Sequence, residues 1–237
     1  MNDAPLTPPV LTARGLTKSY GPTRALAGVD LAIRPGESVA VMGPSGSGKT
    51  TLLHVLSGII VPDAGQVTLA GADGTRHELT GLNEEHRARL RRERLGFVFQ
   101  EGLLLPELTA RENVAMPLML NGAHRKAAEQ TAARWLESLG LAGMGDRRPG
   151  ELSGGQPVEP DVVFADEPTG ALDSDTSDAV LASLISSTVS RGRTLVVVTH
   201  DPSVAAACSR LVRVRDGRIE SDTAQRPAQP ASEGTVR

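Results

Sequence analysis

The sequence has few aromatic residues, one cysteine and no long apolar run. Aromatic residues make up 2% of its 237 residues, which argues against the stacking surfaces that bind single-stranded nucleic acid. Cys208 has no partner for an internal disulfide, so we expect a small buried apolar residue in a protein of the reducing cytoplasm. No apolar run reaches the roughly 18–20 residues that span a bilayer, and residues 1–5 lack the features of a signal peptide. If the protein serves a membrane process, a partner must supply the membrane part.

The charge of the chain is nearly balanced. Its 25 basic and 28 acidic side chains give a formal net charge of −3, so no nucleic acid partner and no acidic membrane surface are indicated. Charges of both signs crowd residues 84–94. This pattern favours a solvated helix with ion pairs on its surface, and a docking surface for a partner is the alternative.

The order of apolar segments predicts an α/β fold. Continuous apolar runs bounded by polar residues are typical of parallel strands buried on both faces. Four such runs occur, at Val39–Met42, Phe97–Phe99, Val162–Ala165 and Leu195–Val198. Helical patterns alternate with them, so active groups are expected at the carboxyl ends of the strands.

The other segments predict additions to this core. Peripheral antiparallel strands are expected at residues 12–17, 29–33 and 66–69, and a final hairpin with a type I′ turn around Asp216-Gly217. The length fits one domain with an inserted subdomain. We expect a domain at 10–221, with a core of 10–100 and 157–221, a helical subdomain at about 101–156, and disordered tails at 1–9 and 222–237.

Residues 43–50 match the phosphate-loop pattern G-x-x-x-x-G-K-[ST] in full. The pattern lies between an apolar strand and a helix that begins near Lys49, which is the context it requires. Its glycines let backbone N–H groups turn toward phosphate oxygens, and the helix points its positive end at the same anion. We expect Lys49 to reach the β- and γ-phosphates and the Thr50 hydroxyl to bind Mg²⁺. The nucleotide contacts expected in this segment are Gly43, Pro44, Ser45, Gly46, Ser47, Gly48, Lys49, Thr50 and Thr51.

Two acidic residues, Asp166 and Glu167, follow the apolar run at 162–165. Together with a complete phosphate loop, this pair indicates nucleotide hydrolysis. Asp166 would bind Mg²⁺ through water, and Glu167 would polarise the attacking water as general base. His54, one turn into the helix after the loop, is expected to pack against its neighbours rather than to bind a ligand.

The chain resembles the ATP-binding cassette (ABC) ATPases over nearly all of residues 10–220. The sequence Leu-Ser-Gly-Gly-Gln at 152–156, downstream of the phosphate loop, is similar to the signature of that family. The resemblance implies a P-loop NTPase (RecA-like) α/β core with a peripheral antiparallel β subdomain and an inserted α-helical subdomain. It also implies ATP and Mg²⁺ as ligands and a head-to-tail homodimer that encloses two ATP molecules.

The resemblance assigns roles to further residues by their place in the motif order. Tyr20 matches the aromatic residue that stacks on adenine, and Gln100 matches the glutamine that senses Mg²⁺ and the γ-phosphate side. His200 matches the switch histidine that contacts the γ-phosphate, and residues 170–173 match the loop that contacts the other cassette. In the dimer, the signature residues Ser153, Gly154 and Gly155 would contact the γ-phosphate bound to the partner chain.

Residues 104–109, 112–114 and 165–173 look like the macrolide-exporter and lipoprotein-release group. In that group the cassette drives a membrane permease. The resemblance therefore implies export of a drug, peptide or lipoprotein by a cytoplasmic ATPase held on the inner face of the cell membrane through its permease. The permease determines most of the choice of substrate.

The connection after the signature is short. In the family a helix of several turns follows the signature, but here residues 157–160 alone separate Gln156 from Asp161, and Pro157 and Pro160 oppose a continuous helix. The five Cα–Cα steps from Gln156 to Asp161 can span at most about 17 Å when fully extended. Either the strand at 162–165 keeps its place and the signature is displaced, or the reverse. We expect the first, because a buried central strand has more apolar contact to lose, and we therefore expect nucleotide binding with weak or absent hydrolysis.

Three functions fit these features to different degrees. The first is the ATPase subunit of an ABC transporter. A soluble ABC protein of DNA repair or translation is less favoured, because the chain has no long coiled-coil insert, zinc cysteines or second cassette. The third is a vestigial or regulatory cassette that binds nucleotide only. Co-purification with a permease separates the first two, and an ATPase assay separates the first from the third.

Overall fold

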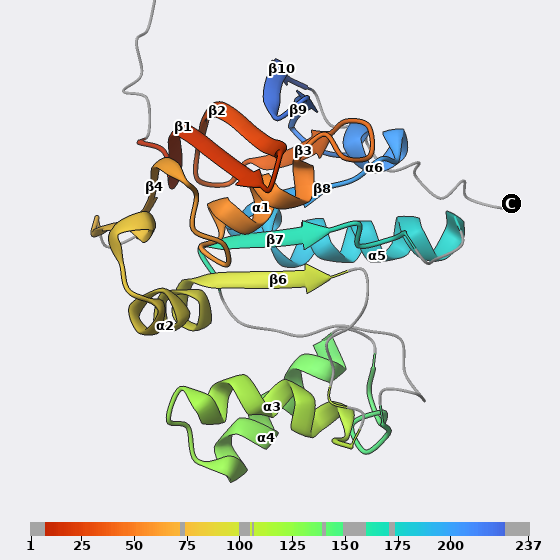
Figure 1. Cartoon of the computed structure of the whole chain (residues 1–237). Coiled ribbons are helices and arrows are strands. Elements are labelled where there is room, and N and C mark those ends of the chain that lie inside the picture. Colours follow the sequence, from red (N-terminus) through yellow and green to blue (C-terminus); the bar gives the residue numbers. More distant parts are fainter. Residues whose placement is uncertain are drawn as a thin grey trace, which may run out of the picture.

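The computed structural model describes residues 8–71, 74–99, 105, 107–138, 141–148, 160–170 and 174–225. Their strands form two sheets, of six strands in the order β10-β9-β3-β8-β7-β6 and of four strands in the order β2-β1-β4-β5. A pair of helices, α3 and α4, lies apart from the sheets, beyond β6 (Figure 1). The arrangement confirms the predicted α/β core with a peripheral antiparallel sheet and a helical subdomain.

The six-stranded sheet forms the centre of the fold. Its strands are β3 (Ser38–Met42), β6 (Leu95–Phe99), β7 (Val162–Asp166), β8 (Thr194–Val198), β9 (Arg210–Arg215) and β10 (Arg218–Ala224). The pairings from β9 to β6 are parallel, and β10 pairs with β9 antiparallel. All of β8 and the first four residues of β7 are buried. Burial on both faces explains why these strands are apolar throughout, as the sequence predicted.

The four-stranded sheet contains the predicted peripheral strands and one more. Its members are β1 (Leu11–Tyr20), β2 (Thr23–Ile33), β4 (Ala64–Ala70) and the short β5 (Arg76–Glu78). They pair antiparallel. Helix α1 (Lys49–Leu56) lies between the two sheets, where four of its eight residues are at most 1% exposed. One apolar cluster therefore joins both sheets through α1.

Helices cover the other face of the six-stranded sheet. Helix α5 (Ser174–Ser187), the 3₁₀ turn η3 (Val189–Arg191) and helix α6 (Pro202–Ala206) follow β7 and β8. Leu181 of α5 and Val204 of α6 pack in one cluster with Val163, Leu195 and Cys208. The cysteine is fully buried, as predicted, and burial raises the pKa of its thiol to about 11, so it is expected to be unreactive.

The helical subdomain has a small core of its own. Helices α3 (Ala110–Leu120) and α4 (Arg125–Ser138) pack through alanines and leucines. Thr109 and Glu112 form a reciprocal capping box at the start of α3, which satisfies two of its free N–H groups. None of the described helices combines the length and the apolar character that crossing a bilayer requires.

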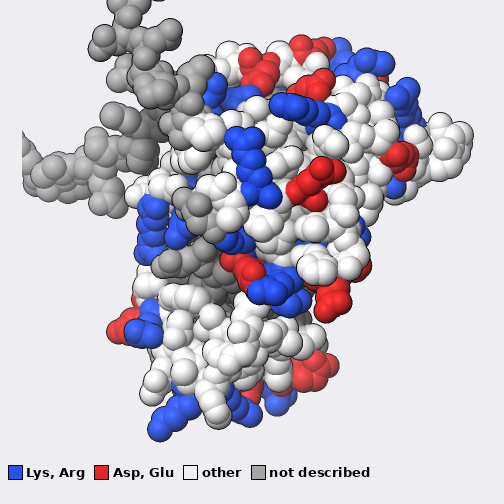
Figure 2. Space-filling view, turned by 90° about the vertical axis from the view of Figure 1, so that its left-hand side faces the viewer, with Lys and Arg blue, Asp and Glu red and all other residues white. Residues whose placement is uncertain are grey.

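The charged segment at 84–94 is a solvated helix. Helix α2 (Glu84–Arg94) follows the 3₁₀ turn η1 (Leu79–Gly81) and buries Leu90 alone among its residues. Ion pairs run along it, from Glu84 to Arg87 and Arg91 at 2.6 Å each. Figure 2 views the side of the molecule on which α2 lies in Figure 1, and acidic and basic side chains are interspersed over this face. The predicted helix with ion pairs on its surface is therefore confirmed.

Strand β7 keeps its central place although the connection before it is short. It pairs with β6 on one side and β8 on the other, each over five residues. Asp161, just before β7, lies 3.1 Å from Arg94 and 3.6 Å from Arg193, which precede β6 and β8. Its backbone N–H donates to Arg94, and its carbonyl accepts from Thr194. One carboxylate thus joins the starts of three strands. The expectation for the strand is confirmed, whereas the signature at 152–156 lies outside the described residues.

We predict that Asp161→Asn destabilises the protein. The Asp161 side chain is 9% exposed between two arginines, so the neutral amide would remove the charge from both ion pairs, at a cost of about 1–3 kcal/mol in the free energy of unfolding. Urea unfolding measures this change. Asp178→Asn, on the exposed surface of α5, is the matched control. Equal stabilities of the two variants would contradict the anchoring role.

Candidate functional site

The phosphate loop connects β3 to α1 at the carboxyl edge of the parallel sheet. Two of its glycines lie against backbone carbonyls of other strands. A Cβ on Gly43 would come within 2.0 Å of the Val214 oxygen, and one on Gly48, where φ is +101°, within 2.2 Å of the Ala25 oxygen. No side chain fits at these distances, so the glycines are required for packing as well as for turning N–H groups toward an anion.

The β9–β10 hairpin supports the loop from behind. Its turn has φ values of +49° at Asp216 and +70° at Gly217, which confirms the predicted type I′ turn. Gly217 donates its N–H to the Ser47 carbonyl at 3.0 Å, and its own carbonyl accepts from Ala27 at 2.8 Å. The hairpin and β2 thus hold the loop between them. The sequence predicted the hairpin but contained no sign of this contact.

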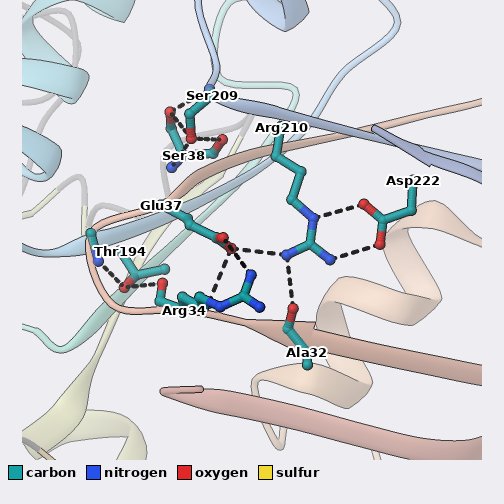
Figure 3. A network of polar contacts seen from close by, with 9 residues as sticks. Ala32, Arg34, Glu37, Ser38, Thr194, Ser209, Arg210 and Asp222 are labelled. Atoms are coloured by element: carbon teal, nitrogen blue, oxygen red, sulfur yellow. Dashed lines mark hydrogen bonds and ion pairs between the residues drawn. The ribbon is translucent and has the colours of Figure 1, made fainter. Parts of the chain in front are cut away.

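Arg210 anchors the other end of the hairpin. Its guanidinium makes two 2.7 Å hydrogen bonds to Asp222 across the two strands, and a further nitrogen donates to Glu37 at 2.9 Å and to the Ala32 carbonyl at 2.8 Å (Figure 3). The bidentate contact with Asp222 raises the pKa of Arg210, against the opposing effect of burial. Figure 3 also shows Ser38 and Ser209 bonded beside this group. The network ties the hairpin to the edge of the peripheral sheet.

The loop presents groups that match a phosphate. Lys49 Nζ donates to the carbonyls of Gly43 and Pro44, at 2.8 and 3.0 Å, so the ammonium group folds back over the start of the loop. The Ser47 hydroxyl is buried and has no hydrogen-bond partner among the described residues. A buried hydroxyl without a hydrogen-bond partner lowers the free energy of unfolding by about 1–3 kcal/mol. A phosphate oxygen in the loop could accept from both side chains.

The two acids lie where β7 ends, next to the loop. Thr50 donates its hydroxyl to Asp166 Oδ1 at 3.3 Å. Burial raises the pKa of Asp166, and the bond from Thr50 partly opposes this shift. Glu167 has a left-handed backbone, with φ +48°, and its N–H donates to Val198 of β8 at 2.9 Å. The carboxylate of Glu167 lies 2.8 Å from His200 Nδ1.

The structure fits Mg²⁺ at this position. The Thr50 hydroxyl and a carboxylate oxygen of Asp166 come within hydrogen-bond distance of each other. Mg²⁺ takes one or two such protein oxygens and completes its shell with phosphate oxygens and water. The partly desolvated carboxylate would also gain from a cation. The ring of His54, on α1, is half-buried and lies close enough to Asp166 to oppose the rise that burial causes in the pKa of that carboxyl, so the packing role expected for His54 stays a prediction.

Tyr20 is the last residue of β1, and its side chain is 48% exposed. The ring is therefore accessible to a ligand. Pro44, Ser45 and Gly46 are exposed in the loop, and Thr51 is half-buried in the first turn of α1. The remaining expected site residues, Gln100, Ser153, Gly154 and Gly155, lie outside the described residues, as do positions 171–173 of the dimer-contacting loop.

A groove of about 330 Å³ lies elsewhere on the molecule. Asp161, Arg193, Thr194 and Pro35 are among its lining residues. These residues stand at the amino ends of β3, β7 and β8. The groove is therefore at the opposite edge of the sheet from the phosphate loop and the two acids, and it plays no part in the site described above.

The fold and the loop together define the chain as a P-loop nucleotide-binding protein. Residues 26–170 match the family model described as ABC transporter. The chain is 41% identical to the bacitracin export ATP-binding protein BceA of Halalkalibacterium halodurans, over 89% of this chain and 87% of that protein. It is 39% identical to the lipoprotein-releasing system ATP-binding protein LolD of Porphyromonas gingivalis, over 90% of this chain and 100% of that protein. The chain belongs to the ABC transporter family and is an ABC ATPase by descent.

Two further comparisons agree with membership of the ABC transporter family. The macrolide export ATP-binding/permease protein MacB of Marinobacter nauticus is 41% identical over 91% of this chain, which corresponds to 35% of that longer protein. The dimeric bacterial ABC transporter cassette MJ0796 superimposes with a TM-score of 0.81 at 34% identity, covering 91% of this chain and 99% of the other. The same cassette is known as a dimer bound to ADP and phosphate.

We predict that Asp166→Asn stabilises the nucleotide-free protein in EDTA. Because burial raises the pKa of Asp166, the folded state holds its proton more tightly than the unfolded state, and the ionised carboxylate opposes folding at neutral pH. Asparagine removes that charge and can still accept from Thr50. We expect the melting temperature to rise by about 1–3 °C at pH 7. The gain should shrink as the pH falls into the ordinary aspartate range. Asp178→Asn is the control, and an unchanged or lower melting temperature for Asp166→Asn would contradict the prediction.

Proposed function

We propose that this chain binds Mg-ATP in cis at the phosphate loop and works as the ATP-binding subunit of a membrane exporter. The observation that carries the proposal is the prepared loop. Its glycines lie against the Ala25 and Val214 carbonyls, the Ser47 hydroxyl lacks a partner, and Lys49 is folded over the loop. A triphosphate would replace the weak carbonyl acceptors of Lys49 with charged oxygens and give Ser47 an acceptor.

The residues at the end of β7 and β8 suit hydrolysis. Glu167 would orient and deprotonate water as general base, and His200, 2.8 Å from it, would hold its carboxylate and face the γ-phosphate. Thr50 and Asp166 would hold Mg²⁺, which when bound would neutralise charge on the phosphates. Tyr20 would stack on the base. Gln100 would sense Mg²⁺, and Ser153, Gly154 and Gly155 would act on the ATP of a partner chain.

We further propose that the short connection impairs hydrolysis. β7 is fixed by its two neighbours and by Asp161, so four residues cannot hold a helix of several turns between the signature and Asp161. Both alignments contain positions that have no counterpart in this chain. The alignment with the lipoprotein-releasing relative runs over 223 positions but includes 90% of the 237 residues, about 213 (0.90 × 237). That with the bacitracin export relative runs over 224 positions and includes 89%, about 211 (0.89 × 237).

Partners and cargo are inferred from relatives. Their names describe export of macrolides and bacitracin and release of lipoproteins, which supports a transmembrane permease as partner and a place on the inner face of the cell membrane. A dimeric cassette of similar fold supports head-to-tail pairing of two copies. We propose a single ABC domain that begins at residue 10, with its helical part at about 101–156. The expected boundary at 221 is too early, because Asp222, Thr223 and Ala224 are paired with β9 in strand β10. A permease that co-purifies with the chain would support coupling.

A cassette that binds nucleotide but does not turn it over is the second candidate. The specific observation in its favour is the short segment at 157–160, which leaves the loop and the acids intact while removing the helix that presents the signature. The two candidates agree on ATP binding and differ in steady-state hydrolysis.

We predict that Lys49→Ala weakens ATP binding by about ten- to hundredfold, the loss expected for one charge-assisted hydrogen-bond partner. Calorimetric titration with ATP in EDTA and in Mg²⁺ measures the change. Lys126→Ala is the matched control, because Lys126 is exposed on α4 in the helical subdomain. Binding equal to that of the parent chain would argue against the loop as the ATP site.

We predict that the parent chain hydrolyses Mg-ATP at least about tenfold more slowly than the Porphyromonas gingivalis relative, a difference of about 1.4 kcal/mol in the barrier. Replacing residues 157–160 with the corresponding segment of that relative should raise the rate, since it restores a helix behind the signature. Glu167→Gln in the grafted chain should abolish the gain. A parent chain that hydrolyses as fast as the relative would refute the impairment.

A further inference from the structure

Lys18 and Tyr20 lie together near the end of β1. They are two residues apart in one strand, at a point where the register between β1 and β2 shifts. Lys18 Nζ lies 5.8 Å from the centroid of the Tyr20 ring, within the distance at which a cation is attracted to the face of an aromatic ring. The Lys18 side chain is 19% exposed, whereas Tyr20 is 48% exposed. The cation is therefore more enclosed than the ring beside it.

Asp63 holds Lys18 in this position. One carboxylate oxygen accepts from Lys18 Nζ at 3.0 Å, and the other accepts from the Ser19 N–H at 2.7 Å. The backbone N–H of Asp63 donates to the Thr17 carbonyl at 2.8 Å. The bond from Lys18, followed by that from Ser19, lowers the pKa of the Asp63 carboxyl, so the carboxylate is charged at neutral pH. One residue thus binds three consecutive residues of the strand that ends at Tyr20.

Asp63 also connects the strand to the phosphate loop. It lies in the segment between the end of α1 and the start of β4, and α1 begins at Lys49 in the loop. Ile59 and Ile60 of this segment donate to the His54 carbonyl at 2.9 and 3.0 Å, which fixes the segment to the last turn of α1. The strand that carries Tyr20 is therefore attached to the helix that begins in the phosphate loop.

We propose that Lys18, fixed by Asp63, is a positioning residue that holds the Tyr20 ring for stacking on the nucleotide base and thereby sets the base-dependent part of ATP affinity. The proposal rests on the proposed stacking role of Tyr20. A tyrosine at a strand end can turn about two side-chain torsions, and a cation against its ring restricts that freedom before a base arrives. Lys18 is itself a flexible side chain, and its ion pair with Asp63 removes that flexibility in advance.

The experiment compares two ligands that differ in the base. Affinities for ATP and for inorganic tripolyphosphate are measured by calorimetric titration on the full chain, for the parent, Lys18→Met, Lys18→Arg, Tyr20→Ala and the double variant Lys18→Met/Tyr20→Ala. Lys126→Met, on exposed α4, is the matched control for loss of one lysine charge. Thermal unfolding of each variant verifies that the fold is retained.

We expect Lys18→Met to weaken ATP binding by about two- to fivefold, the range that an exposed cation–π contact allows, and to leave tripolyphosphate binding unchanged. Lys18→Arg should retain the parent affinity, and Lys18→Met should have no further effect once Tyr20 is alanine. Equal losses of affinity for both ligands, or a loss that persists without Tyr20, would overturn the proposal in favour of direct contact between Lys18 and the phosphates. An unchanged ATP affinity in Lys18→Met would also overturn it. If Tyr20→Ala alone leaves ATP affinity unchanged, base stacking and this inference both fail, while loss of binding in Lys49→Ala would still identify the phosphate loop as the ATP site.

Discussion

The close contact of the phosphate loop with two backbone carbonyls is the constraint on which the rest of the site depends. Gly43 lies against Val214 near the end of β9, and Gly48 lies against Ala25 near the start of β2. Neither contact tolerates a Cβ, so the loop shape is set by strands from both ends of the chain. The hairpin that supplies one carbonyl is held by Gly217 at its turn and by Arg210 at its base. The prepared loop is thus a product of the whole fold and not of the eight-residue motif alone.

Several features at this site oppose folding locally. The Ser47 hydroxyl is buried without a partner, the Asp166 carboxyl is partly desolvated, and Glu167 takes a left-handed backbone. Each costs free energy, of order 1–3 kcal/mol for the strained backbone or the unpaired hydroxyl. The apolar cluster around α1 offsets these costs, because Leu52 and Leu56 are at most 1% exposed there. Such costs concentrate where a ligand supplies the missing partner.

The sequence predicted the features that leave a local pattern. Continuous apolar runs identified the buried parallel strands, the charge pattern identified α2, and Asp216-Gly217 identified a type I′ turn. The contacts between distant elements could not be predicted in this way. Lys18 and Asp63 are 45 positions apart, and a glycine packed on a remote carbonyl looks like any other glycine. These contacts depend on how segments remote in the sequence pack together, which the periodicity of apolar residues does not encode.

The effect of the short connection follows from the relative strength of two attachments. Val162, Val163 and Phe164 are at most 6% exposed, and full burial of such side chains contributes about 1.5–3 kcal/mol each. Moving β7 would therefore cost several kcal/mol, in a fold whose whole free energy of unfolding is of order 5–15 kcal/mol. It would also break the backbone hydrogen bonds to β6 and β8 and the ion pairs of Asp161 with two arginines. Asp166 is the last residue of β7, and Glu167 follows it. The strand register places Asp166 opposite Phe99 of β6 and Val198 of β8. The same register therefore holds the two acids beside Thr50. A change in the connection is thus kept away from the groups that serve the chain's own nucleotide.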